Sequence, residues 1–70
     1  MSHRMPSTVI SRFSYDERSR NLYIWFVSGK LYRYKGVPKN LYEGMRRAVS
    51  RGSFFNRKIK DLFEFDRLSE

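Results

Sequence analysis

The stretch "LYIWFVSGKLYRYK", residues 22–35, predicts a β-hairpin. Both halves are rich in β-branched and aromatic residues, and a Ser-Gly pair at 28–29 supplies turn chemistry between them. A two-residue turn would set Ile24 opposite Arg33 and so place charge on the core face, which is costly. A three-residue turn with Gly29 in the left-handed region shifts the pairing by one residue. We predict the three-residue turn, because it leaves one continuous apolar face.

This register gives the two faces of the hairpin different characters. The core face carries Leu22, Ile24, Phe26, Tyr32 and Tyr34. The outward face carries Tyr23, Trp25, Leu31 and Arg33. We therefore interpret Tyr32 and Tyr34 mainly as core residues whose hydroxyls reach the margin of the sheet. The exposed platform consists of Tyr23, Trp25 and Arg33.

The segment before the hairpin, "TVISRFSY" at residues 8–15, alternates with a period of two residues and predicts another strand. Strict alternation sets Val9, Ser11, Phe13 and Tyr15 on one side and Ile10, Arg12 and Ser14 on the other. The turn-forming residues of "DERSRN" then separate this strand from the hairpin.

Beyond the hairpin, "PKNLYEGMRRAVS" at residues 38–50 predicts an amphipathic helix, with Pro38 in its first turn. Its apolar stripe consists of Leu41, Tyr42, Met45, Ala48 and Val49. Gly44 lowers helix propensity by about 1 kcal/mol relative to alanine, and a close approach of the helix to the sheet would compensate for it.

The last third of the chain predicts less regular structure. Phe54, Phe55 and Ile59 anchor a short second helix. A fourth edge strand near residues 62–66, with Phe63 and Phe65 on one face, is left open. The fold class is thus α+β: a three-stranded antiparallel meander packed against an amphipathic helix and a short second helix. We predict a flexible tail at 1–7, one domain at 8–66 and a C-terminal tail at 67–70.

Composition points to an anionic partner. Fifteen Lys and Arg against seven Asp and Glu give a formal net charge of +8 over 70 residues, with a sequence pI near 10.3. Ten of the fifteen are arginine, which binds phosphate bidentately and stacks on flat rings. This charge on so small a domain predicts nucleic acid as the partner, with acidic lipid headgroups or an acidic protein as the alternatives.

Catalytic and metal chemistry is poorly supported. The chain has no cysteine, and its one histidine, His3, falls in the predicted tail. The acidic residues Asp61, Glu64, Asp66 and Glu70 match no calcium-loop spacing, so we interpret them as a solvated, charge-balancing tail. We predict no enzyme activity, cofactor, metal or small-molecule substrate. Without an apolar membrane span or signal peptide, a cytoplasmic protein is expected.

Several patches together resemble the KTSC domain. They are "YD" at 15–16, "LYIWF" at 22–26, "SG" at 28–29, "YRY" at 32–34, "VP" at 37–38 and "SRGSFFNRKI" at 50–59. The resemblance runs from about Ser7 to Phe65, and the central Tyr-x-Tyr of the family falls on Tyr32 and Tyr34. The family is named for the C-terminus of certain lysyl-tRNA synthetases and also occurs as small free-standing bacterial and phage proteins.

The resemblance implies no activity, and it implies RNA binding only through the attachment of the family to a tRNA-charging enzyme. Positions 23 and 25 are commonly polar or charged in the family, whereas here they are Tyr23 and Trp25. An aromatic platform would therefore be particular to this chain.

We predict a small basic module that binds nucleic acid, RNA rather than DNA, through phosphate contacts and base stacking. The predicted contact residues are Tyr23, Trp25, Arg33, Lys35, Arg46, Arg47, Arg51, Arg57, Lys58 and Lys60. The alternative is a protein-interaction module or homodimer that uses the aromatic platform.

Overall fold

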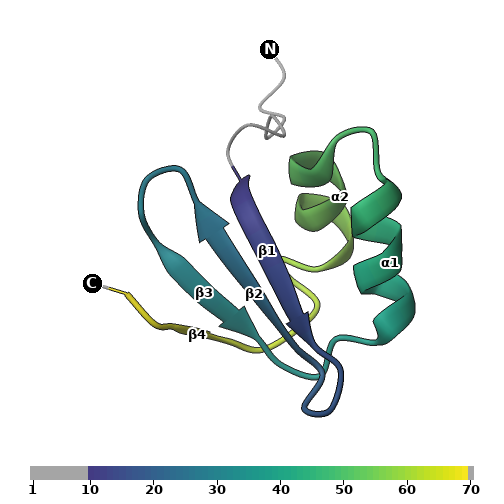
Figure 1. Cartoon of the computed structure of the whole chain (residues 1–70), viewed down its shortest axis with the longest axis horizontal. Helices are drawn as coiled ribbons and strands as arrows, with labels where there is room; N and C mark the ends of the chain where they lie inside the picture. Colours follow the sequence, from purple (N-terminus) through teal and green to yellow (C-terminus); the bar gives the residue numbers. More distant parts are fainter. Residues whose placement is uncertain (1–9, 70) are drawn as a thin grey trace.

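Four antiparallel strands in the order β1-β2-β3-β4 form the sheet of this protein, whose computed structural model describes residues 10–69 (Figure 1). The elements are β1 Ile10–Asp16, β2 Asn21–Phe26, β3 Leu31–Tyr34, α1 Lys39–Arg47, α2 Arg51–Lys58 and β4 Phe65–Arg67. The predicted α+β class and meander are confirmed, and a fourth strand is present. The predicted tail at 1–7, with His3, lies outside the described residues.

The turn between β2 and β3 has three residues, as the hairpin sequence predicts. Gly29 adopts φ = +96°, its amide donates to the Phe26 carbonyl (2.9 Å), and the Phe26 amide donates to the Lys30 carbonyl (2.9 Å). Leu22 pairs with Tyr34 and Ile24 pairs with Tyr32. The apolar side chains of the hairpin therefore share one face.

Strand β1 departs from the predicted strict alternation. A bulge between Ile10 and Arg12 shifts the pairing with β2, so that Ile10 lies opposite Phe26 while Phe13 lies opposite Ile24. The extra residue brings Ile10 to the core face, where it is buried, and leaves Ser11 exposed. The prediction that Ile10 lies on the same side of the strand as Arg12 is wrong.

The core forms between one face of the sheet and the two helices. Its sheet side includes Leu22, Ile24 and Tyr34, and its helical side includes Met45, Phe55 and Ile59, all nearly inaccessible to solvent. Tyr42 of α1 stacks on Tyr15 of β1 at a centroid distance of 4.7 Å. Figure 1 shows both helices on the β1 side of the sheet, away from β4.

Helix α1 is shorter than its sequence pattern predicts. Pro38 is the N-cap, with ψ = 149°, and the helix ends at Arg47 because Ala48 is already extended. Val49, predicted on the apolar stripe, is fully exposed. Gly44 does permit a close approach, but to α2 instead of the sheet: a Cβ atom built there would lie 2.8 Å from the Phe54 ring.

Strand β4 begins three residues later than predicted and continues beyond residue 66. Phe65 pairs with Tyr34 and Arg67 pairs with Tyr32. The Leu68 amide donates to the Leu31 carbonyl (2.8 Å), and the Leu31 amide donates to Ser69 Oγ (2.7 Å). Residues 67–69, predicted as a tail, therefore extend the sheet edge.

Candidate nucleic-acid interface

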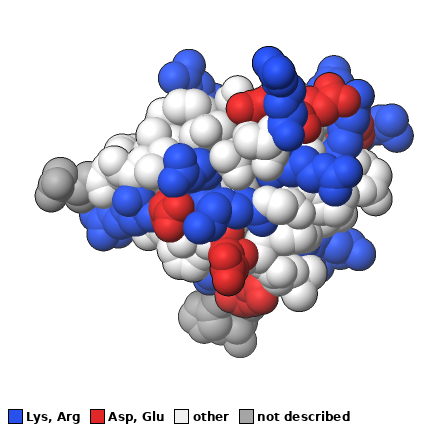
Figure 2. Space-filling view, turned by 90° about the horizontal axis from the view of Figure 1, so that it is seen from below, with Lys and Arg blue, Asp and Glu red and all other residues white. Residues whose placement is uncertain are grey.

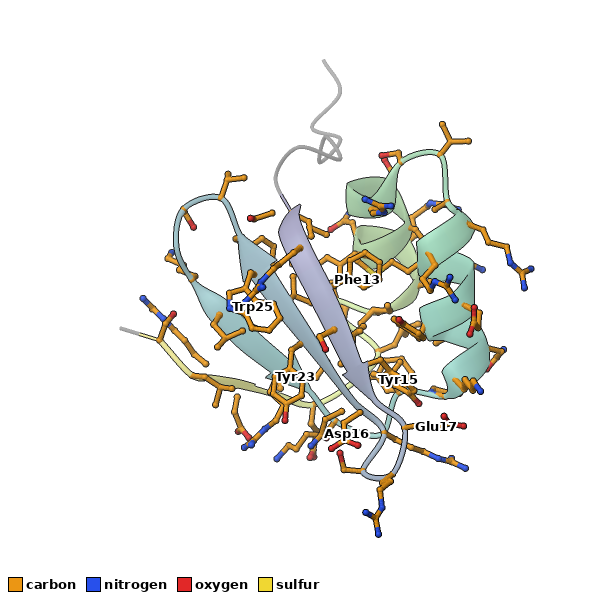
Figure 3. All side chains as sticks on the ribbon, viewed as in Figure 1. Phe13, Tyr15, Asp16, Glu17, Tyr23 and Trp25 are labelled. Carbon is orange, nitrogen blue, oxygen red and sulfur yellow. The ribbon has the colours of Figure 1, made fainter. Side chains whose placement is uncertain are left out.

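The outward face of the sheet carries the predicted aromatic platform. Tyr23 and Trp25 lie side by side on β2, with ring centroids 6.3 Å apart and planes tilted by 31°. Figure 3 shows them on the opposite side of the strands from Phe13 and Tyr15, which point toward α1. The Arg12 guanidinium lies 4.2 Å from the centroid of the Trp25 ring, a cation–π contact that covers part of the platform.

The cations beside this platform have an acidic partner. Arg33 Nη2 lies 2.8 Å from Asp66 Oδ2, and Lys35 Nζ lies 3.5 Å from the same oxygen. The hydrogen bond from Arg33 lowers the pKa of Asp66 and raises that of Arg33 itself. Asp66, predicted as part of a solvated tail, instead holds β4 against β3, because the two strands place it opposite Arg33.

The remaining predicted contact residues lie on or just after the two helices. Arg46 forms an ion pair with Glu43 (2.9 Å), and the Arg51 guanidinium lies 5.4 Å from the Phe13 ring centroid. Four others form no ion pair within residues 10–69: Arg47, Arg57, Lys58 and Lys60. Among the predicted contact residues, those of the helical layer are therefore the most available to an anion.

Two of these cations share a groove. A cavity of about 660 Å³ separates the C-terminal half of α1 from α2, and it is lined by Gly44, Arg47, Ala48, Val49, Ser50, Ser53, Phe54 and Arg57. We call it the interhelical groove. The Phe54 ring lies against Gly44 on one side of this space, and Arg47 and Arg57 both border its concave surface.

The predicted contact residues thus divide between two faces of the molecule. Tyr23, Trp25, Arg33 and Lys35 lie on the outward face of the sheet, whereas the helical cations lie beyond the core, which fills the space between. Figure 2, viewed from the end that carries the β1–β2 turn, shows acidic side chains set between the basic ones. The structure does not bring all ten residues together.

The two tyrosines of the Tyr-x-Tyr pattern have different surroundings. Tyr34 is 3% exposed, and burial raises its pKa to about 12, with smaller contributions from Tyr32 and Asp61. Tyr32 is only partly buried and borders an open groove beside Phe65. Sequence reasoning missed this groove. The patterns at 29–38 and 62–66 indicate which side chains are apolar, but they do not show which part of the core face the helices leave uncovered.

No cluster of three His, Cys, Asp or Glu side chains within residues 10–69 could hold a metal ion. Neither of the helices described here has the length and apolar character needed to cross a bilayer.

Comparison with known proteins identifies the family. The family model of the KTSC domain matches residues 6–63. A lysine–tRNA ligase of Nostoc punctiforme is 42% identical over 62 residues, and one of Trichormus variabilis is 33% identical over 60 residues. These segments are 89% and 86% of this chain, which spans only 11% of the length of either ligase.

A solved structure gives the same result. The crystal structure of a KTSC domain protein from Yersinia pestis matches with a TM-score of 0.80 and 36% identity, covering 86% of this chain and 84% of that one. The resemblance predicted from the motifs is therefore confirmed.

Proposed function

The chain belongs to the KTSC domain family, and we propose that it is a non-enzymatic module that binds RNA. Basic side chains of the helical layer contact the phosphates of the strand, so affinity depends little on base sequence. The relatives include lysine–tRNA ligases, whose name refers to an RNA, and this favours RNA over DNA as the partner. The proposal includes the earlier expectation that the protein binds this RNA in the cytoplasm.

The observation that carries the proposal is the pair of arginines at the interhelical groove. Arg47 and Arg57 border the same concave surface, and neither has an acidic partner within residues 10–69. Arginine presents a planar fork of donors that fits a phosphate, and an unpaired guanidinium need not break an ion pair to bind one. Lys58 and Lys60 extend the positive charge past the end of α2.

The aromatic platform favours a second candidate function, a protein contact or self-association. Arg33 and Lys35 are engaged by Asp66, and Arg12 covers Trp25, so this face offers little free positive charge to a phosphate. Tyr, Trp and Arg are the residue types enriched in the cores of protein interfaces. The two candidate functions use opposite faces and are compatible in one molecule.

A pair of matched double variants tests which face contacts RNA. Arg47→Gln with Arg57→Gln removes two positive charges from the helical layer, and Arg12→Gln with Lys35→Gln removes two from the sheet face. We expect the helical pair to weaken binding of a single-stranded RNA about tenfold or more, since each charged hydrogen bond contributes about 1.5–3 kcal/mol. The sheet pair keeps nearly wild-type affinity in a filter-binding assay.

Circular dichroism of both variants provides the folding control, because all four substituted side chains are exposed. If the sheet pair weakens binding as much as the helical pair, the phosphate contacts do not belong to the interhelical groove. If the wild-type protein binds no RNA, the proposed function is wrong.

A further inference from the structure

The core face of the sheet is not covered over its whole width. Next to β3 and β4 it borders a groove of about 590 Å³, lined by aromatic residues of β2, β3, α2 and β4 and by the charged residues Lys30, Lys60 and Asp61. We call it the Tyr32 groove. In Figure 1, α1 and α2 lie on the β1 side of the sheet, and β4 lies at its far edge.

Aromatic rings form the floor and walls of this groove. Tyr34 and Phe55, which are almost fully buried, meet edge to face at a centroid distance of 5.2 Å. Phe26 packs edge to face against Tyr32 at 5.6 Å. Phe65 lies 5.3 Å from Tyr32 and 5.2 Å from Tyr34, yet it is 49% exposed. The rings are therefore held in place by one another, while Phe65 and Tyr32 keep part of their surface exposed to solvent.

Charged side chains surround the aromatic surface. Lys30 comes from the hairpin turn, and Lys60 and Asp61 come from the segment after α2. All three are exposed, and none forms an ion pair within residues 10–69. Two cations beside flat apolar walls fit a ligand that joins a planar ring to a negative charge, which is the chemistry of a nucleotide.

We infer that the Tyr32 groove holds one unstacked base of a bound RNA strand, with the flanking phosphates at Lys30 and Lys60. This inference rests on the proposed function and adds a base subsite to it. Lys60 connects the two surfaces, because it belongs to the helical cations and also lines the groove. Asp61 accepts hydrogen bonds from amino groups on the edge of the base, as carboxylates do from cytosine N4.

The floor of the groove suits a neutral, planar ligand. The phenol of Tyr34 is protonated at neutral pH, as an ordinary tyrosine is, so its hydroxyl can donate to a base oxygen or nitrogen. No described residue accepts a hydrogen bond from that hydroxyl. The volume of the groove also falls within the range of about 300–1,000 Å³ that is usual for small-ligand pockets.

The test compares a ten-nucleotide oligoadenylate RNA with an abasic ribose-phosphate strand of equal length and charge. The wild-type protein should bind the oligoadenylate about fivefold or more tightly than the abasic strand, because stacking contributes about 1–3 kcal/mol per base. Phe65→Ala should lose this difference and keep its affinity for the abasic strand. Leu62→Ala is the matched control, since Leu62 is an exposed apolar residue outside the groove.

An NMR measurement on the wild-type protein does not depend on the folding of any variant. The ring protons of Tyr32 and Phe65 should shift with the oligoadenylate and stay in place with the abasic strand. Equal affinities for both strands, with unshifted rings, would overturn the base subsite and leave the phosphate contacts standing. Failure to bind either strand would instead overturn the proposed function.

Discussion

Tyr34 couples the stability of the domain to alkaline pH. Its phenol is nearly inaccessible, and burial raises its pKa from 10.0 in the unfolded chain to about 12. The folded state therefore favours the protonated phenol. The resulting contribution to stability is fully present below pH 10 and is lost as the pH rises through the folded pKa near 12.

We expect the free energy of unfolding of the wild-type protein to fall by an amount on the order of 2 kcal/mol between these two pH values because of Tyr34 alone. Tyr34→Phe keeps the ring and removes the titrating group. Its unfolding free energy, measured by urea denaturation across the same range, should fall less steeply. A variant whose profile parallels the wild-type profile would mean that Tyr34 ionises without cost in the folded state.

Single residues also show where sequence reasoning succeeds. The turn at Gly29 was predictable because the competing register would place Arg33 on the core face, and the cost of burying a charge decides between the two. The bulge at Ile10 was not predictable, because its neighbours Val9 and Ile10 are both apolar and either one could supply the buried side chain. Only the pairing with β2 distinguishes them.

At the scale of elements, the helix–helix contact depends on one missing side chain. Gly44 in α1 faces Phe54 in α2, and a Cβ atom at position 44 would lie 2.8 Å and 3.1 Å from two carbons of the Phe54 ring. Alanine normally stabilises a helix interior by about 1 kcal/mol relative to glycine. In this domain the displaced ring opposes that gain.

We therefore expect Gly44→Ala to leave the melting temperature unchanged or to lower it. In the Phe54→Ala background the same substitution should stabilise the domain by about 1 kcal/mol, because the ring no longer obstructs it. Thermal melts of the four proteins in this double-mutant cycle measure the coupling. Equal effects of Gly44→Ala in both backgrounds would show that the two residues do not contact each other in solution.

The ends of elements were harder to predict than their existence. Periodicity places Val49 on the stripe with Met45, but α1 ends at Arg47 and leaves Val49 exposed. A periodic pattern does not reveal where tertiary packing stops a helix. Similarly, the aromatic pattern at 62–66 left a fourth strand open, whereas the structure has one that begins at Phe65, where this ring packs on Tyr32 and Tyr34.

For the whole molecule, the sequence predicts how much charge there is but not on which face it lies. The net charge of +8 and the helical position of Arg47 and Arg57 follow from the sequence. That these arginines, on α1 and α2, lie across the core from Trp25 follows only from the packing of the helices on the opposite face of the sheet. Likewise, Asp66 neutralises Arg33 only because β4 pairs with β3 in a particular register.

This division of charge predicts how RNA affinity responds to salt. Five predicted cations of the helical layer form no ion pair within residues 10–69, namely Arg47, Arg51, Arg57, Lys58 and Lys60. If each neutralises one phosphate, the logarithm of the association constant plotted against the logarithm of salt concentration should have a slope of about −3.5 for a single strand. Removing Arg47 and Arg57 should reduce the slope to about −2.1, because two fewer counterions are released. Filter binding over a range of salt concentrations measures both slopes.

The sheet-face variant, Arg12→Gln with Lys35→Gln, lowers the net charge by the same two units and is therefore the decisive control. Counterion release depends on the phosphates that are contacted, so this variant should keep the wild-type slope even though its net charge equals that of the helical variant. Equal slopes for the two variants would mean that RNA responds to the overall positive field of the protein. Unequal slopes, with only the helical variant reduced, would assign the phosphate contacts to the layer that contains Arg47 and Arg57.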